Sequence, residues 1–308
     1  LGRNAERTPR VVRSRGMPLL ELLLAIASTG CVRTELPSQA VMLPLVSFGE
    51  DSLPLVEVEL SGRRVSFILD FGAGITIVSK QWCDTLRCQP AGRMAGLRHT
   101  GEVLELPLVT VPSLQLGPVR ETQVVTAVMD LAPWQQVAPI AGVLSLQALE
   151  HVPFSLDLAR HTLVVGRGSI PATNGADSTR TSIALIREHP HALTLAVPVF
   201  LDGHPLGWGL VDTGSPQTYL HAYWKDALAH RGRPLAVREE RGWTGHRESV
   251  QSWSVRGLTF LDRRITPDSA TVGVKRMVPD ALIGLDWLRR RVLSCDLEAR
   301  WCTVEPVR

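Results

Sequence analysis

The sequence is built from short runs in which apolar and polar residues alternate. Residues 55–60 alternate in this way, Ser61-Gly62 follows as a turn, and residues 65–70 form a second apolar run. Successive side chains of a β-strand point to opposite faces of a sheet, so this period of two predicts strands. Two such runs joined by a short turn predict a β-hairpin.

The same pattern returns in the second half of the chain. Residues 194–201 and 206–212 are apolar runs separated by Asp202-Gly203, and Asp-Gly is a strong signal for a hairpin turn. Short helices are expected at 79–87, 146–151, 222–230 and 287–291. We therefore predict an all-β protein, made mainly of strands with short helices.

Landmarks in the two halves recur at one spacing. The second strand of each hairpin ends in an aspartate, and Asp70 and Asp212 are 142 positions apart (212 − 70). A later apolar stretch in each half contains one glycine, and Gly142 and Gly284 are also 142 positions apart (284 − 142). Each glycine therefore follows its aspartate by the same distance, which indicates an internal duplication.

Two further landmarks keep the same order. Residues 154–158 match 293–297 after a length difference of three residues, and Thr100-Gly101 matches Thr244-Gly245 in polar turns. Four landmarks in one order predict two copies of one folding unit. Residues 166–182 lie between the copies and are rich in Gly, Ser, Thr and Asn, which is typical of a linker.

Length and composition agree with two folded units. The chain has 308 residues, of which 44% are hydrophobic and 20% charged, so a packed core is expected. The net charge of +3 is too small, and the arginines too scattered, to indicate nucleic-acid binding. The predicted parts are a targeting segment at 1–31, a tether or short pro-segment at 32–50, an N-terminal lobe at 51–165, a linker at 166–190 and a C-terminal lobe at 191–308.

The start of the chain is similar to an export signal. Five arginines between positions 3 and 15 precede an apolar run at 18–27, which is too short to span a bilayer. Residues 28–31 are similar to a bacterial lipoprotein processing site, in which Cys31 is lipidated and anchors the protein to a membrane. We expect an exported protein, periplasmic or membrane-anchored. A start at Met17 removes the basic flank, and an unstructured apolar tail is the alternative.

The remaining cysteines indicate one disulfide and no metal site. A turn at Glu298-Ala299 places Cys295 opposite Cys302 on a hairpin, where an oxidising compartment favours a disulfide. Cys83 and Cys88 lie in a short helical stretch, and we expect free thiols there. A metal site needs ligand spacings such as CxxC, and the sequence has neither this spacing nor suitably placed histidines.

The two aspartate loops carry the functional resemblance. Residues 212–215 read Asp-Thr-Gly-Ser after an apolar strand, and residues 70–73 read Asp-Phe-Gly-Ala in the same context. Together with the later apolar-apolar-Gly stretches, the pattern resembles the aspartic protease family over about residues 50–306. Two copies in one chain resemble the pepsin arrangement, and one copy per chain resembles retroviral proteases. With the lipoprotein-like start, the chain resembles a two-lobed bacterial-type member.

The resemblance implies a two-lobed acid-protease fold that acts as a monomer, needs no cofactor and binds a peptide or protein substrate in the cleft between its lobes. Two carboxylates that share a proton supply both the base that activates water and the acid that protonates the scissile carbonyl. Asp70 and Asp212 are the implied catalytic pair. The implied supporting residues are Gly72, Ala73, Thr213, Gly214 and Ser215 in the loops, and Gly142 and Gly284 in strands passing behind them.

The first loop departs from the family pattern at Phe71, where the family has Thr or Ser. In the family this hydroxyl bonds across to the opposite loop, so Thr213 can make the bond and Phe71 cannot return it. Three interpretations follow: an active aspartic endopeptidase, a weakened relative that binds peptides without cutting them, or a chain that acts only as a dimer. The fourth residues also differ, because Ser215 has a hydroxyl to stabilise an ionised aspartate and Ala73 has none.

The resemblance also implies a flap, which is a hairpin that closes over the bound peptide. Residues 97–103 are the candidate, with the tip near Thr100-Gly101. The family uses a flap tyrosine, yet both tyrosines of this chain lie in the second copy, so His99 or Trp134 would have to replace it. Other chemistries lack their motifs, because the sequence has no P-loop, no HExxH and no Gly-x-Ser-x-Gly.

Overall fold

A computed structural model describes residues 39–49, 51–170, 180–230, 232–241, 247–262 and 270–307. The targeting segment with Cys31 and the Thr244-Gly245 turn lie outside these residues, so both predictions stay open. Within the described ranges, no helix has the length and apolar character needed to cross a membrane.

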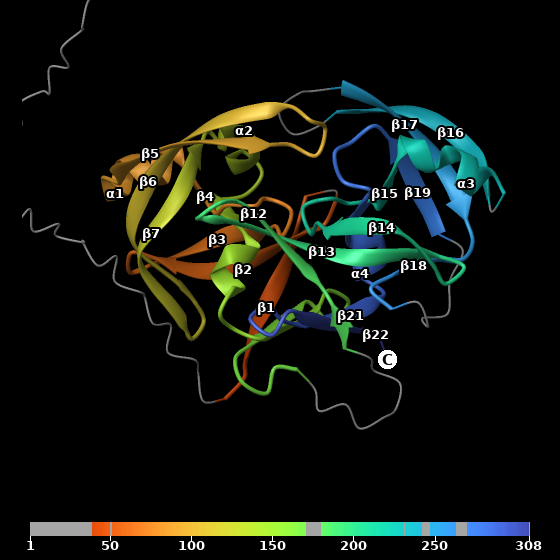
Figure 1. The fold of residues 1–308 in the computed structure, drawn as a ribbon. Helices are drawn as coiled ribbons and strands as arrows, with labels where there is room; N and C mark the ends of the chain where they lie inside the picture. Colours follow the sequence, from red (N-terminus) through yellow and green to blue (C-terminus); the bar gives the residue numbers. More distant parts are fainter. Residues whose placement is uncertain are drawn as a thin grey trace, which may run out of the picture. The chain divides into compact units, whose positions relative to one another are not determined.

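The protein is mainly β, as predicted (Figure 1). The helices are short: α1 (Lys80–Leu86), α2 (Ala132–Gln135), α3 (Lys225–Ala229) and α4 (Leu285–Leu288), with 3-10 turns η1 (Leu146–Leu149) and η2 (Ala222–Trp224). The strands of the first half are β1 (Val41–Phe48), β2 (Leu53–Leu60), β3 (Arg63–Leu69), β4 (Ile77–Ser79), β5 (Gln89–Leu97), β6 (Val103–Leu116), β7 (Val119–Met129), β8 (Ile140–Leu144), β9 (Phe154–Asp157) and β10 (Thr162–Val165). Those of the second half are β11 (Thr181–Ser182), β12 (Ala184–His189), β13 (Ala192–Leu201), β14 (His204–Val211), β15 (Tyr219–His221), β16 (Gly232–Arg241), β17 (Arg247–Val255), β18 (Leu258–Phe260), β19 (Ala270–Lys275), β20 (Ala281–Ile283), β21 (Arg291–Asp296) and β22 (Trp301–Pro306).

The strands form two sheets, each built mainly from one copy of the repeat. One sheet has the order β11-β22-β21-β9-β10-β1-β2-β3-β8-β4-β7-β6-β5. The other has the order β12-β13-β14-β20-β15-β19-β17-β16, with β18 beside β13. The last two strands of the chain join the first sheet, where Ser294 of β21 pairs with Ser155 of β9. This architecture is the predicted two-lobed, all-β fold.

Turn chemistry explains both hairpins that the sequence predicts. Ser61 and Gly62 have φ angles of 50° and 82°, and Asp202 and Gly203 have φ angles of 50° and 76°. Two-residue turns with positive φ at both positions match the right-handed twist of the paired strands. Small or short polar residues tolerate this conformation. They fix the register, which pairs Leu55 with Ile68 in the first hairpin.

The short helices begin at specific contacts. The Ser79 side chain accepts a hydrogen bond from the Trp82 amide at 3.3 Å and caps α1, within the segment predicted as helical. The last helix begins earlier than the predicted residue 287, because the Leu285 amide is anchored at 2.9 Å on the carbonyl of Ser215. The chain then leaves the helix, and Arg291 already belongs to β21.

Two segments expected to connect elements belong to the sheets instead. Strand β1 lies within 32–50, the predicted tether or pro-segment, yet it pairs with both β2 and β10. Strand β12 lies within the predicted linker at 166–190 and pairs with β13. Ordered sheet structure thus extends beyond the predicted lobe boundaries on both sides, while residues 171–179 of the linker lie outside the described part of the chain.

The sheet register corrects one landmark of the duplication. In the first copy Leu69 pairs with Leu144, and in the second copy Val211 pairs with Ile283. The next residue is Ser145 in the first copy and Gly284 in the second, so Ser145 is the counterpart of Gly284. The first copy is three residues longer than the second between its aspartate and this strand. The equal spacing of Gly142 and Gly284 from their aspartates therefore does not mean that the two glycines are equivalent.

Candidate active site

The two aspartates occupy equivalent places at the ends of β3 and β14. The Asp70 amide donates to the Leu144 carbonyl at 2.9 Å, and the Asp212 amide donates to the Ile283 carbonyl at 3.0 Å. These bonds continue the parallel strand pairing by one residue, so each aspartate starts its loop from a fixed position. The Asp70 and Asp212 carboxyl groups lie close enough to affect the pKa of each other.

The glycine of each loop binds the carboxylate of its own loop and leaves room for the carboxylate of the opposite loop. The Gly72 amide donates to Oδ1 of Asp70 at 2.8 Å, and the Gly214 amide donates to Oδ1 of Asp212 at 3.0 Å. A Cβ at Gly72 would lie 2.5 Å from Cγ of Asp212, and a Cβ at Gly214 would lie 2.3 Å from Oδ2 of Asp70. Any side chain at either position would therefore displace the carboxylate of the opposite loop.

The environment makes the two carboxyl groups unequal. Burial, the charge of Asp212 and the hydrogen bond to Asp212 raise the pKa of Asp70 well above its ordinary value, although the amides of Gly72 and Ala73 lower it. Burial also raises the pKa of Asp212, but the charge of Lys275, the Gly214 amide and the bond with Asp70 oppose this rise. Both carboxyl groups therefore hold a proton more strongly than an exposed aspartate does, and they titrate as a pair.

Residues 56–148 match the aspartyl protease family model. The match includes Asp70 and its loop, whereas Asp212 lies beyond it. No curated protein matches the sequence.

Solved structures show the same fold at low identity. Basic 7S globulin from soybean is 13% identical with a TM-score of 0.52, and the alignment covers 87% of this chain and 95% of that chain. Conglutin gamma, a basic 7S globulin from lupine seeds, is 12% identical with a TM-score of 0.52 and the same coverage. The protein named edgp is 9% identical with a TM-score of 0.53, again with 87% and 95% coverage. At these identities the likeness concerns the fold alone.

In this aspartyl-protease-like site, Thr213 ties the two loops together. Its buried Oγ1 accepts a hydrogen bond from the Phe71 amide at 3.0 Å and donates to the Leu69 carbonyl at 2.7 Å. Both bonds reach the opposite copy and end on main-chain atoms. The crossing bond therefore needs only the backbone of residue 71, and the Phe71 side chain does not prevent it.

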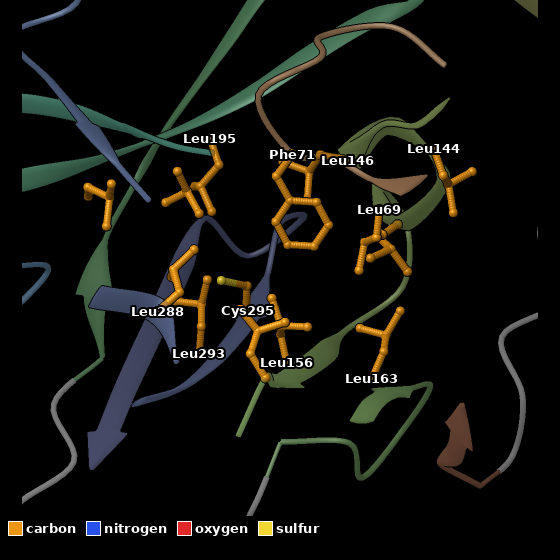
Figure 2. Packing of buried hydrophobic residues seen from close by; sticks show 14 of the residues in the cluster. Leu69, Phe71, Leu144, Leu146, Leu156, Leu163, Leu195, Leu288, Leu293 and Cys295 are labelled. Carbon is orange, nitrogen blue, oxygen red and sulfur yellow. The ribbon is translucent and has the colours of Figure 1, made fainter. Parts of the chain in front are cut away.

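The Phe71 side chain has an apolar role. It is fully buried and packs edge-on against Phe154, with ring centroids 5.5 Å apart. Figure 2 shows the ring among leucines of both halves of the chain, including Leu146 and Leu195. Apolar packing thus takes the place of the second hydroxyl bridge that the family pattern has at this position.

The fourth loop residues do not act as the sequence suggested. The Ser215 hydroxyl donates to the Gln217 carbonyl at 2.8 Å, so this bond is directed along its own loop and not toward Asp212. The amides of Ala73 and Ser215 behave alike, each donating to the carbonyl of its own aspartate at 3.3 Å. The expected electrostatic difference between the loops arises elsewhere, from the charge of Lys275 near Asp212.

Only one of the two predicted glycines passes behind a loop. A Cβ at Gly284 would lie 2.4 Å from the Gln217 carbonyl carbon and oxygen, so this strand does run against the second loop. A Cβ at Gly142 would instead lie 2.1 Å from the Ile77 carbonyl oxygen, next to β4. Behind the first loop stands Ser145, whose amide donates to Oγ1 of Thr76 at 3.2 Å.

The predicted flap is a hairpin formed by β5 and β6. Its tip is closed by bonds from the Arg98 amide to the Glu102 carbonyl and from the Gly101 amide to the Arg98 carbonyl, each 2.9 Å. Of the two candidates for the missing flap tyrosine, His99 lies in this tip. Trp134 lies in α2, where it is partly buried against the core.

Two residues that contact the flap tip were not predicted from the sequence. Lys275 at the end of β19 and Glu248 in β17 form an ion pair at 2.6 Å, and His99 of the flap lies beside both. The side chain of Lys275 is only 4% exposed. The signal in the sequence was a single lysine that ends the apolar run 270–275, but no local pattern could pair it with residues 27 and 176 positions away.

The cysteines of the described region fall into two classes. Cys295 and Cys302 face each other across the β21–β22 hairpin and form a disulfide, as the turn at Glu298-Ala299 predicts. Cys83 and Cys88 remain free thiols, and burial with a hydrogen bond to Cys83 raises the pKa of Cys88 to about 12. No cluster of side chains suited to a metal ion occurs in the described ranges.

Proposed function

We propose that the protein is an aspartic endopeptidase that hydrolyses peptide bonds with Asp70 and Asp212. The observation that carries this proposal is the mutual fit of the loops, in which each glycine leaves room for the opposite carboxylate. Two carboxyl groups in contact cannot both ionise easily, so one serves as base and the other as acid at the same pH.

The pair shares one proton, so at any moment one carboxyl group is ionised and the other is protonated. The ionised member takes a proton from the attacking water, and the protonated member donates its proton to the oxygen of the scissile carbonyl. The substrate class is an extended peptide or protein segment, bound between the lobes beneath the β5–β6 hairpin.

The alternative function is peptide binding without cleavage, and Phe71 favours it. Residue 71 offers no hydroxyl to the opposite loop, and a dyad held from one side is less rigid than one held from both. The bonds of Thr213 argue for activity instead, because they cross between the copies and reach the loop that Phe71 occupies.

A peptide-library digest decides between the two functions. The folded chain without its first 31 residues is incubated with the library from pH 3 to pH 7, with Asp70→Asn and Asp212→Asn as matched variants. Cleavage that each variant loses by about three orders of magnitude supports the proposal. Peptide binding without cleavage at any pH supports the alternative, and undiminished cleavage by either variant refutes the two-carboxylate mechanism.

We also propose export of the protein. The arginine-rich start and the apolar run at 18–27 favour it, and a disulfide between Cys295 and Cys302 suits an oxidising compartment. Lipidation at Cys31 remains the proposed form of membrane attachment, and mass spectrometry of the mature N-terminus would test it.

A further inference from the structure

The tip of the flap is bonded to the opposite lobe. The Val278 amide donates to the His99 carbonyl at 2.7 Å, which joins the turn between β5 and β6 to the segment after β19. Beside this bond, Gly101 has a φ of +87°, and its Cβ position lies 3.7 Å from Cγ2 of Val278. In Figure 1 the hairpin can be followed from the first sheet toward β17 of the second.

The side chain of His99 adds a second attachment. Its Nε2 lies 3.3 Å from Nζ of Lys275 and 3.9 Å from Oε1 of Glu248. Lys275 in turn donates to Glu248 at 2.6 Å and lies over the Tyr219 ring at 3.9 Å from its centroid. The flap tip therefore meets a charged cluster whose other members all belong to the second lobe.

The chemistry of the cluster defines how His99 is bound. An ammonium group only donates hydrogen bonds, so Nε2 of His99 accepts from Lys275 and the imidazole proton lies on Nδ1. Lys275 is nearly buried and Glu248 is 15% exposed, so solvent screens this contact less than an exposed one. Burial would raise the pKa of Glu248, but the hydrogen bond and the charge of Lys275 lower it.

We propose that His99 locks the flap onto the second lobe in the free protein, and that a peptide must break this lock to reach the dyad. The lock consists of the His99 carbonyl bonded to Val278 and the His99 ring bonded to Lys275. The inference rests on the proposed function for its biological meaning, since that function makes the dyad the site that a peptide must reach. The lock itself is a property of the free protein and can be measured without substrate.

Hydrogen exchange of the flap amides tests the lock directly. In His99→Ala the amides of residues 98–102 should exchange about tenfold faster than in the wild type, because a hydrogen bond to a charged group is lost. In His99→Gln a side-chain oxygen can still accept from Lys275, so exchange should stay within about threefold of the wild type. Arg93→Ala removes an exposed ion pair within the same hairpin and should leave the exchange unchanged.

Two outcomes would overturn the lock. Unchanged exchange in His99→Ala would show that the His99 ring does not hold the flap. Equally fast exchange in His99→Gln and His99→Ala would show that accepting a bond from Lys275 is not what matters.

Kinetic measurements of peptide cleavage distinguish a lock that excludes substrate from a purely structural role of His99. Since substrate must break the lock, KM in His99→Ala should fall about threefold or more. A rise in KM would mean that His99 holds substrate rather than excludes it, and would overturn the proposal. If the wild type cleaves no peptide, the proposed function fails, and the exchange experiment still decides whether the lock exists.

Discussion

Replacing Phe71 by threonine should destabilise the protein strongly. The side chain is fully buried and pairs with Phe154 at 5.5 Å, so the change opens a cavity and removes an aromatic contact. Large-to-small changes of this kind cost about 3–5 kcal/mol, and loss of the aromatic pair is included in that range. For a chain of this size we expect the midpoint of thermal unfolding to fall by on the order of 10 °C.

The same substitution should have little effect on the dyad. The bond that crosses to Thr213 starts from the amide of residue 71, and every residue except proline keeps this amide. A new threonine hydroxyl that found a partner in the opposite loop would add about 0.5–1.5 kcal/mol, so turnover should change by no more than about tenfold.

Thermal unfolding followed by circular dichroism, together with peptide cleavage well below the midpoint, measures both effects. Phe71→Leu is the matched control, because it keeps an apolar side chain and should lose only about 1–2 kcal/mol. An unfolding midpoint of Phe71→Thr within about 1 °C of the wild type would refute the packing role of Phe71.

Three other substitutions have expected outcomes. Thr213→Val leaves the Phe71 amide and the Leu69 carbonyl unsatisfied, so denaturant unfolding should show a loss of about 2–4 kcal/mol. Asp70→Asn should raise the unfolding midpoint at pH 7 but not at pH 3. A carboxyl whose pKa is raised in the folded state contributes stability below its unfolded-state pKa and loses it as the pH rises through the folded-state pKa. The amide of Asn does not ionise, so it avoids this loss at pH 7. Equal midpoint shifts at both pH values would contradict this linkage. Cys295→Ser removes a disulfide that closes a short loop of sequence separation 7, and calorimetry should show a loss of about 2–3 kcal/mol, unlike Cys83→Ser.

Local chemistry made part of the fold and site predictable from the sequence. The Ser61-Gly62 and Asp202-Gly203 turns fix two hairpins, and the ends of these hairpins fix the positions of Asp70 and Asp212. The disulfide follows from the register of one short turn. Each of these features depends on residues close together in the chain.

The features that the sequence did not predict depend on contacts between distant segments, or on a residue spacing that did not reflect structural equivalence. Strand β1 is stabilised by β10, more than 100 residues away, and its own sequence gives a weak signal. Gly142 matched Gly284 in number, whereas the pairing of β3 with β8 shows that Ser145 has the equivalent place. The cluster around His99 joins three strands or turns from both copies, so no local pattern revealed it.

The contact between β9 and β21 has a symmetry of its own. Ser155 and Ser294 are equivalent residues of the two copies (294 − 155 = 139, as for 296 − 157), and they pair with each other, their hydroxyl oxygens 2.8 Å apart. The flanking pairs are exchanged across this point, so a local two-fold axis passes between the two serines. Such a contact is isologous, as in a C2 homodimer. A single copy would expose this strand edge and could cover it with a second identical chain, so the fused protein carries within one polypeptide an interface that two separate subunits could have formed.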